Sequence, residues 1–173
     1  MLYCRTHIFL NEGTTPMKLL IVVAALLLLI VPVLAQEAEP VEFPLTVTDK
    51  TGTEITLDAP AENILCLSIA CIDHLHQLGV EPAGITDLLA LPYELYFGEI
   101  DDDMTIISGG MQPDIEQIAA MGPDIIIGQA GFFDALREAF GSIAPLFLIY
   151  PTTVEDTIAE VETLGLITDR MEE

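Results

Sequence analysis

Basic residues are scarce in this chain. Its 173 residues include 5 Lys and Arg against 28 Asp and Glu, which gives a formal net charge of −23 at pH 7. A surface of that sign repels phosphate groups and anionic lipids, so the charge argues against nucleic acid as a partner. It attracts cations and basic protein surfaces. A solvated acidic surface without any partner, as in a salt-adapted protein, would have the same composition.

The common catalytic signatures are also missing. No G-x-G-x-x-G follows a predicted strand, no glycine-rich loop ends in lysine, and no G-x-S-x-G elbow occurs. Nucleotide cofactors need the close backbone approach that such glycines allow. Ser68, Asp73 and His74 share a segment, but their spacing gives no reason to place the serine against the imidazole. We expect neither an enzyme nor a cofactor, and an enzyme on a dinucleotide-type sheet remains the alternative.

Metal-ligand spacing is absent as well. His74 and His76 lie two residues apart on a predicted helix, whereas a shared ion needs a spacing of three or four. The acidic run 101–103 lacks the glycine and the distal glutamate of a calcium loop. We interpret the run as a solvated turn and predict no metal site.

A long apolar run lies near the N-terminus. It covers residues 19–34, follows Lys18, and ends at the small residue Ala35. This pattern predicts a signal peptide over residues 1–35, with Met17 as the start and cleavage before Gln36. An uncleaved membrane anchor is the alternative, because about 20 apolar residues span a bilayer. No cysteine follows the junction directly, so a lipoprotein is not supported. We expect export to the periplasmic or extracellular face of the cell envelope.

Two cysteines follow the predicted signal segment. Cys66 lies in an apolar strand and Cys71 at the start of the next predicted helix. Export permits a disulfide between them. Because spacing alone does not show whether the Cβ atoms face each other, two buried, unpaired thiols are the alternative.

The remaining chain alternates strand and helix patterns. Residues 36–44 form an acidic, proline-containing leader, and residues 45–47 and 54–57 predict a β-hairpin around a turn at 49–53. Helices alternating with apolar strands predict an α/β fold, a mainly parallel sheet with helices on both faces. The predicted strands are 64–67, 83–86, 105–107, 125–127 and 146–149, and the predicted helices are 71–78, 115–121 and 132–140, with a loop between residues 86 and 105.

The last segment predicts a longer helix. Thr152 or Thr153 can cap its start, and Val154, Ile158 and Leu164 fall on one face. No glycine or proline stop follows, so we expect a long helix over residues 152–173 that is cut short.

With these elements in place, residues 45–173 resemble the N-terminal lobe of class III substrate-binding proteins of ABC importers. The resemblance rests on LTVTDKTGTEITLDAPAENILCLS, LGVEPAGITD, SGGMQPDIEQIAAMGPDIIIG and IYPTTVEDTIAEVETLG, in this order. It implies one lobe over residues 45–151 and the start of an interlobe helix from residue 152. It also implies a ligand that is an iron-siderophore, haem or cobalamin-like metal chelate, and a membrane permease as partner. An exported acidic interaction module or a non-functional fragment is the alternative.

The resemblance also implies a role for Glu116. In the family pattern PDIE, an acidic residue at this helix start docks the lobe to arginines of the permease. An exposed carboxylate on a rigid helix suits such a bidentate pair. A favourable charge in the first helical turn, worth about 0.3–1 kcal/mol, is the alternative explanation, and both roles can hold together.

Loops at the carboxyl ends of the strands are expected to contact ligand. Aromatic and amide groups there suit a flat, partly apolar chelate, although the aromatic rings could equally pack the loops onto the sheet. Arg137, within a predicted helix, is the one arginine near the predicted loops, which weakens an assignment to anionic chelates. The expected ligand-binding residues are Ser68, Ile69, Ala70, Tyr93, Tyr96, Met111, Gln112, Gln129 and Phe132.

Overall fold

The computed structural model describes residues 41–170 of the chain. It begins with an antiparallel hairpin of β1 (Leu45–Thr48) and β2 (Glu54–Leu57), in which Leu45 pairs with Leu57. Gly52 lies in the connecting turn with φ of 82°, a left-handed conformation that glycine adopts without strain. The predicted hairpin is confirmed.

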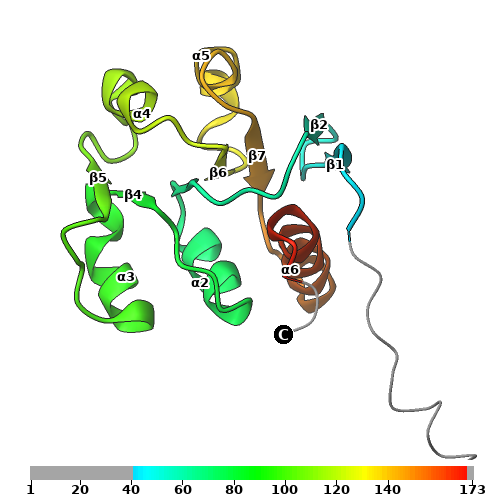
Figure 1. The fold of residues 1–173 in the computed structure, drawn as a ribbon, viewed down its shortest axis with the longest axis horizontal. Coiled ribbons are helices and arrows are strands. Elements are labelled where there is room, and N and C mark those ends of the chain that lie inside the picture. Colours follow the sequence, from blue (N-terminus) through cyan, green and yellow to red (C-terminus); the bar gives the residue numbers. More distant parts are fainter. Residues whose placement is uncertain (1–40, 171–173) are drawn as a thin grey trace, which may run out of the picture. The chain divides into compact units, whose positions relative to one another are not determined.

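A five-stranded parallel sheet follows the hairpin, with the strand order β5-β4-β3-β6-β7 (Figure 1). Its strands are short and largely buried, because helices lie against both faces. Their bounds are β3 (Ile64–Cys66), β4 (Gly84–Thr86), β5 (Thr105–Ile107), β6 (Ile125–Gln129) and β7 (Leu146–Ile149).

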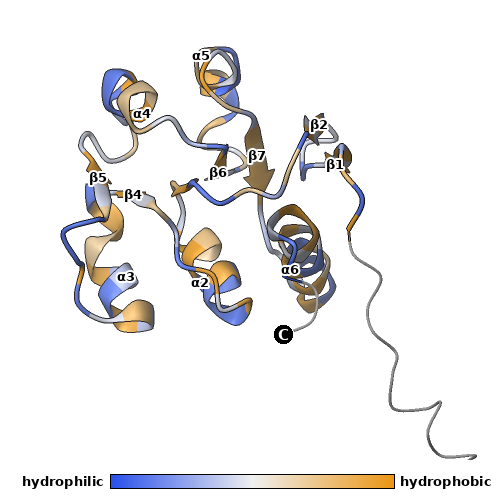
Figure 2. Ribbon diagram, viewed as in Figure 1, coloured by the Kyte–Doolittle hydropathy of each residue, from blue (hydrophilic) through white to orange (hydrophobic). Residues whose placement is uncertain are grey.

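The helices divide between the two faces of the sheet (Figure 1). One core cluster joins the hairpin to α2, α3 and α6, and the other contains side chains of α4 and α5. In Figure 2 the strand β7 between these layers carries the hydrophobic colour. The predicted α/β fold with helices on both faces is therefore confirmed. The helix bounds are α2 (Ile69–Gln77), α3 (Ala90–Phe97), α4 (Ile115–Met121), α5 (Arg137–Gly141) and α6 (Val154–Thr168).

Two segments differ from the sequence prediction. The predicted loop after β4 contains a 3-10 turn η2 (Asp87–Leu89) and the helix α3. The helix was missed because its sequence, ALPYELYF, is apolar on all sides and shows no helical period. The predicted helix 132–140 instead consists of a 3-10 turn η3 (Asp134–Leu136) and the short helix α5.

The helix expected over residues 152–173 is present as α6, but it ends at Thr168, and its role as the start of an interlobe helix stays a prediction. Thr153 caps α6 by accepting a hydrogen bond from Asp156 N–H at 3.0 Å, and the helix ends at Thr168. Asp169 then adopts φ of 55°, and Arg170 N–H donates to Gly165 O at 2.8 Å. This is an ordinary helix-ending turn. The buried side chains of Leu164 and Ile167 make α6 a part of this lobe's own core.

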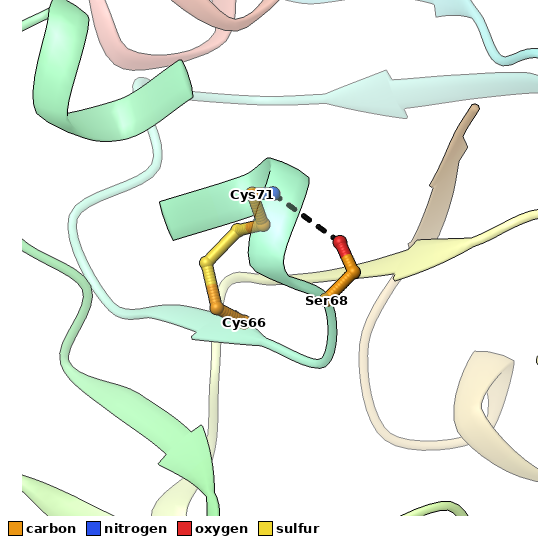
Figure 3. Close-up of a disulfide and its surroundings, with 3 residues drawn as sticks. All are labelled: Cys66, Ser68 and Cys71. Carbon is orange, nitrogen blue, oxygen red and sulfur yellow. Dashed lines mark hydrogen bonds between the residues drawn. A yellow bond between two sulfur atoms is a disulfide. The ribbon is translucent and has the colours of Figure 1, made fainter. Parts of the chain in front are cut away.

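Cys66 and Cys71 form a disulfide (Figure 3). Cys66 ends β3 and Cys71 lies in the first turn of α2, with 5.7 Å between their Cα atoms. Ser68, between them, caps α2 by accepting a hydrogen bond from Cys71 N–H at 3.2 Å. The bridge and the cap together fix the strand-to-helix turn.

Asp49 joins the hairpin to the edge of the sheet. Its side chain is fully buried, and one carboxylate oxygen lies 2.5 Å from the Arg137 guanidinium. The same oxygen accepts a hydrogen bond from Leu148 N–H, and Lys50 N–H donates to Leu148 O. Burial alone would raise the pKa of the Asp49 carboxyl, but donors from Thr51, Arg137 and Thr53 outweigh burial and hold the pKa below its usual range.

The predicted signal segment and residues 36–40 of the leader lie outside the described residues. Within residues 41–170, none of the helices combines the length and apolar character needed to cross a bilayer.

Candidate functional site

The carboxyl ends of all five parallel strands lie along one edge of the sheet, which we call the carboxyl edge. Loops at such an edge are where open α/β sheets bind ligands. A large apolar side chain, exposed by 45–60%, follows each strand at this edge. These side chains are Ile69, Leu88, Met111, Phe132 and Tyr150.

In the turn after β3, the Ser68 hydroxyl group is not exposed at the carboxyl edge. Ser68 is buried and its Oγ is occupied as the cap of α2. Ile69 is exposed and Ala70 is half-buried. Of the three residues expected here, Ile69 therefore offers the most surface to a ligand.

The turn after β5 is held from the neighbouring strand. Asp87, which follows β4, accepts hydrogen bonds from Gly109 N–H at 3.3 Å and from Gly110 N–H at 3.0 Å. Gly109 has φ of 98°, and a Cβ atom there would lie 2.4 Å from Gln112 O. Only glycine fits this turn, which leaves Met111 and Gln112 exposed at the carboxyl edge.

A small open pocket of about 440 Å³ lies where β6, β7 and the hairpin turn meet. Its lining includes the aromatic residues Phe132 and Tyr150 together with Lys50. Lys50 Nζ lies 2.5 Å from Asp156, and this hydrogen bond holds the pKa of the Asp156 carboxyl below its usual range. Gln129, half-buried at the end of β6, immediately precedes the lining residue Ala130.

The Arg137 guanidinium does not lie at the carboxyl edge. Its guanidinium donates to the Asp49 carboxylate and to Leu146 O. Leu146 begins β7, so the guanidinium lies near the start of that strand. Lys50 is therefore the basic side chain that the structure places beside the pocket.

The structure does not bring the two expected tyrosines to the carboxyl edge. Tyr93 is 1% exposed and donates a hydrogen bond to Glu81. Glu81 precedes β4, so it lies at the amino ends of the strands, away from the carboxyl edge. Burial, reinforced by Glu81, raises the pKa of the Tyr93 hydroxyl. Tyr96 packs edge-on against His76 at the end of α2. Both tyrosines serve the packing of α3.

Glu116 lies exposed in the first turn of α4. The cap of this helix is Asp114, whose side chain accepts hydrogen bonds from Glu116 N–H at 2.9 Å and Gln117 N–H at 3.2 Å. Pro113 precedes the cap and is not part of the first turn. The Glu116 carboxylate has no role in the cap.

The two neighbouring histidines have different surroundings. His74 is buried, with Nε2 3.2 Å from the Glu160 carboxylate, whereas exposed His76 contacts Tyr96 and Phe97. Among residues 41–170, no group of three or more His, Cys, Asp or Glu side chains is arranged to hold a metal ion.

A family model described as "Periplasmic binding protein" matches residues 64–173. The chain belongs to the periplasmic binding protein family. The class III resemblance expected from the sequence is thereby confirmed.

Curated relatives of this periplasmic binding protein come from Bacillus subtilis (strain 168). The chain is 28% identical over 130 residues to the petrobactin-binding protein YclQ, covering 70% of this chain and 38% of the relative. It is 23% identical over 129 residues to the Fe(3+)-citrate-binding protein YfmC, covering 73% and 41%. The chain thus spans about two fifths of the length of these relatives.

A solved structure supports the same fold. The crystal structure of YclQ matches with a TM-score of 0.64 at 20% identity, covering 76% of this chain and 47% of that chain. The lobe described here therefore has the fold of the corresponding part of a known binding protein.

The sequence did not predict three residues at the carboxyl edge of this periplasmic binding protein. Leu88 lies two residues after β4 and Tyr150 directly follows β7, so the rule that selected Phe132 after β6 could have found them. Lys50 could not be found in this way, because it belongs to the hairpin and reaches the edge only through tertiary packing.

Proposed function

We propose that this chain is one lobe of the substrate-binding component of an ABC importer for a ferric chelate. The observation that supports this most is the row of exposed apolar side chains at the carboxyl edge, one after each strand. Exposed apolar groups gathered in one place mark a binding surface. The family and the relatives named for petrobactin and Fe(3+)-citrate favour transport, and we propose binding rather than catalysis.

The pocket beside β7 favours a chelate with flat rings and negative charge. Phe132 and Tyr150 offer aromatic surface, and the Lys50 ammonium can attract an anionic group once it exchanges part of its contact with Asp156. The same rings would accept haem or a cobalamin. Iron-siderophore and ferric citrate chelates are favoured by the names of the relatives.

A single lobe supplies only one side of such a site. The relatives are more than twice as long as the matched segment, so we propose that a second lobe covers the carboxyl edge in the complete binding protein. We also propose that the protein acts outside the cytoplasmic membrane, as an exported chain or one held by an uncleaved N-terminal anchor. The alternative, an exported acidic interaction module, would leave the carboxyl edge without a ligand.

Titration of the chain with ferric citrate and with a ferric catecholate tests the ligand proposal. Isothermal titration calorimetry is expected to show dissociation constants weaker than micromolar, because half of the contact surface is missing. Substituting both Phe132 and Tyr150 by alanine should weaken binding a further ~10-fold, since each aromatic contact contributes about 0.5–1.5 kcal/mol.

The control for this titration is Ile158→Ala. Ile158 is an equally exposed apolar residue on α6, away from the pocket, so its substitution should leave the affinity unchanged. Equal affinity in the wild type and in the aromatic double variant would contradict the proposed site. Micromolar or tighter binding by the chain alone would contradict the need for a second lobe.

We further propose that Glu116 docks the lobe to an arginine of the permease. Glu116→Ala, made in a protein that carries both lobes, should reduce chelate uptake by cells at least ~10-fold, because a bidentate pair between partners would be lost. Chelate affinity should not change, since Glu116 lies on α4 and outside the pocket.

Glu155→Ala is the matched control for this docking prediction. Glu155 is also an exposed carboxylate in the first turn of a helix, α6. Its loss removes a comparable interaction with the helix dipole but no proposed partner. Equal uptake by the Glu116 and Glu155 variants would rule out the docking role.

A further inference from the structure

Helix α3 is apolar on all sides. Its eight residues, ALPYELYF, contain one charged side chain, Glu94. Tyr93 is buried in the core and Phe97 packs against it. A helix without a polar face is usually covered on every side. In Figure 2, α3 shows the hydrophobic colour over much of its length.

The outer side of α3 is nevertheless exposed within the described lobe. Leu91 and Leu95 are 67% and 77% exposed, and their spacing of four residues places them one turn apart on the same side. Leu88 extends this row to the carboxyl edge.

Strand β5 adds a further apolar residue. Ile106 pairs with Ile85, whose side chain belongs to the core cluster on the α3 side of the sheet, so Ile106 faces that side too. It is 40% exposed, because β5 is an edge strand. We call Leu91, Leu95 and Ile106 the α3 surface.

The segment that carries the α3 surface is acidic and contains no basic side chain. Residues 87–106 contain six acidic and no basic side chains. Two of the basic residues, Lys50 and Arg137, are paired with Asp156 and Asp49. Both pairs lie near β7, the outer strand on the other side of the sheet from β5. The acidic residues are Asp87, Glu94, Glu99, Asp101, Asp102 and Asp103.

The negative charge of this segment favours one kind of binding partner for the α3 surface over others. A second copy of the chain would set carboxylates against carboxylates, and an anionic bilayer would be repelled. A protein helix with leucine-like side chains flanked by Lys or Arg matches both the apolar row and its acidic surroundings.

We propose that the α3 surface docks a basic amphipathic helix of another protein. The surface lies on the opposite face of the sheet from α4 and Glu116. It lies at the β5 side of the sheet, whereas α6 lies at the β7 side (Figure 1). It is therefore separate from the docking residue proposed above, and it stands whether or not the lobe binds a chelate.

A labelled synthetic helix of leucine and lysine, with all leucines on one side, serves as the probe. Fluorescence anisotropy is expected to show binding to the wild-type chain, and at least ~10-fold weaker binding to a variant carrying both Leu91→Gln and Leu95→Gln. Ile158→Gln on α6 should bind like the wild type, since it removes an exposed apolar residue elsewhere. A scrambled leucine and lysine peptide should bind at least ~10-fold more weakly, and a leucine and glutamate peptide not at all.

Equal binding by the wild type and the double variant would overturn the proposal, because charge alone would then explain the attraction. A wild-type dimer in size-exclusion chromatography with light scattering that the double variant abolishes would assign the surface to a second copy. Sedimentation with phosphatidylserine vesicles that the variant abolishes would assign it to a membrane, and both results would overturn the proposal. Circular dichroism checks the fold, and Leu95→Gln alone, at the most exposed position, replaces the double variant if its spectrum changes.

Discussion

Replacing Phe133 by alanine is expected to lower the free energy of unfolding by about 3–5 kcal/mol. Phe133 is 1% exposed, and its ring lies so close to the backbone of β6 that a Cβ atom on Gly128 would stand 3.0 Å from it. The ring also packs near Phe140 of α5, with 6.4 Å between ring centroids. Removing it leaves a cavity between α5 and the sheet that the short helix cannot fill. Urea denaturation followed by circular dichroism measures the change.

The neighbouring residue supplies the control. Phe132 is 58% exposed, so Phe132→Ala should change the free energy of unfolding by no more than about 0.5 kcal/mol. Its effect is expected on chelate binding instead. Similar destabilisation by the two substitutions would contradict the difference in burial between the two rings.

Replacing Asp49 by alanine is expected to destabilise the lobe by about 3–5 kcal/mol, because it breaks a buried ion pair by removing one partner. The carboxylate accepts hydrogen bonds from Thr51 N–H, Thr53 N–H and Leu148 N–H, besides pairing with Arg137. Without it, these donors lose their acceptor, and the hairpin loses its side-chain links to β7. The free energy of unfolding at pH 7 is the quantity to measure.

The contribution of Asp49 to the free energy of unfolding should decrease at low pH. Its pKa in the folded lobe is held below its usual range, so the stabilisation is fully present above the unfolded pKa of about 3.9. It is lost as the pH falls through the lower pKa of the folded state. The difference in unfolding free energy between wild type and Asp49→Ala should therefore be constant from about pH 5 to 7 and shrink below about pH 4.

Asp156→Ala is the control for the buried pair. Asp156 also contacts a basic side chain, Lys50, but at the surface, where an ion pair contributes little to stability. Its loss should barely change the urea midpoint. A similar effect of both substitutions, or a pH-independent effect of Asp49→Ala, would contradict the role assigned to the buried carboxylate.

Most elements of the fold could be predicted because their signals are local. The apolar run at 125–127 is a strand buried on both faces, and the acidic residues at Asp114 and Glu116 mark the start of α4. The helix α3 could not be predicted, because a helix that is apolar all round has no period to detect. The end of α6 was missed because Asp169, rather than glycine, adopts the left-handed conformation there.

The candidate site was predicted in part. Placing residues after strands found Ile69, Met111 and Phe132, which the structure leaves exposed at the carboxyl edge. Tyr93 and Tyr96 were expected there because the segment was interpreted as a loop; within α3 they point to the core and to α2. Arg137, the arginine expected near the loops, pairs with Asp49 instead, and the hairpin turn places Lys50 beside the pocket.

The sequence by itself determined the strand and helix alternation, the hairpin and the family, because periodicity, caps and turn residues act over a few neighbouring positions. Only the tertiary structure decided which cysteines meet, which aromatic rings reach the carboxyl edge, and which basic residue is buried with Asp49. It also decided that the outer side of α3 has no cover within residues 41–170. Such outcomes depend on contacts between segments as far apart as Asp49 and Arg137, and no local pattern encodes where those segments meet.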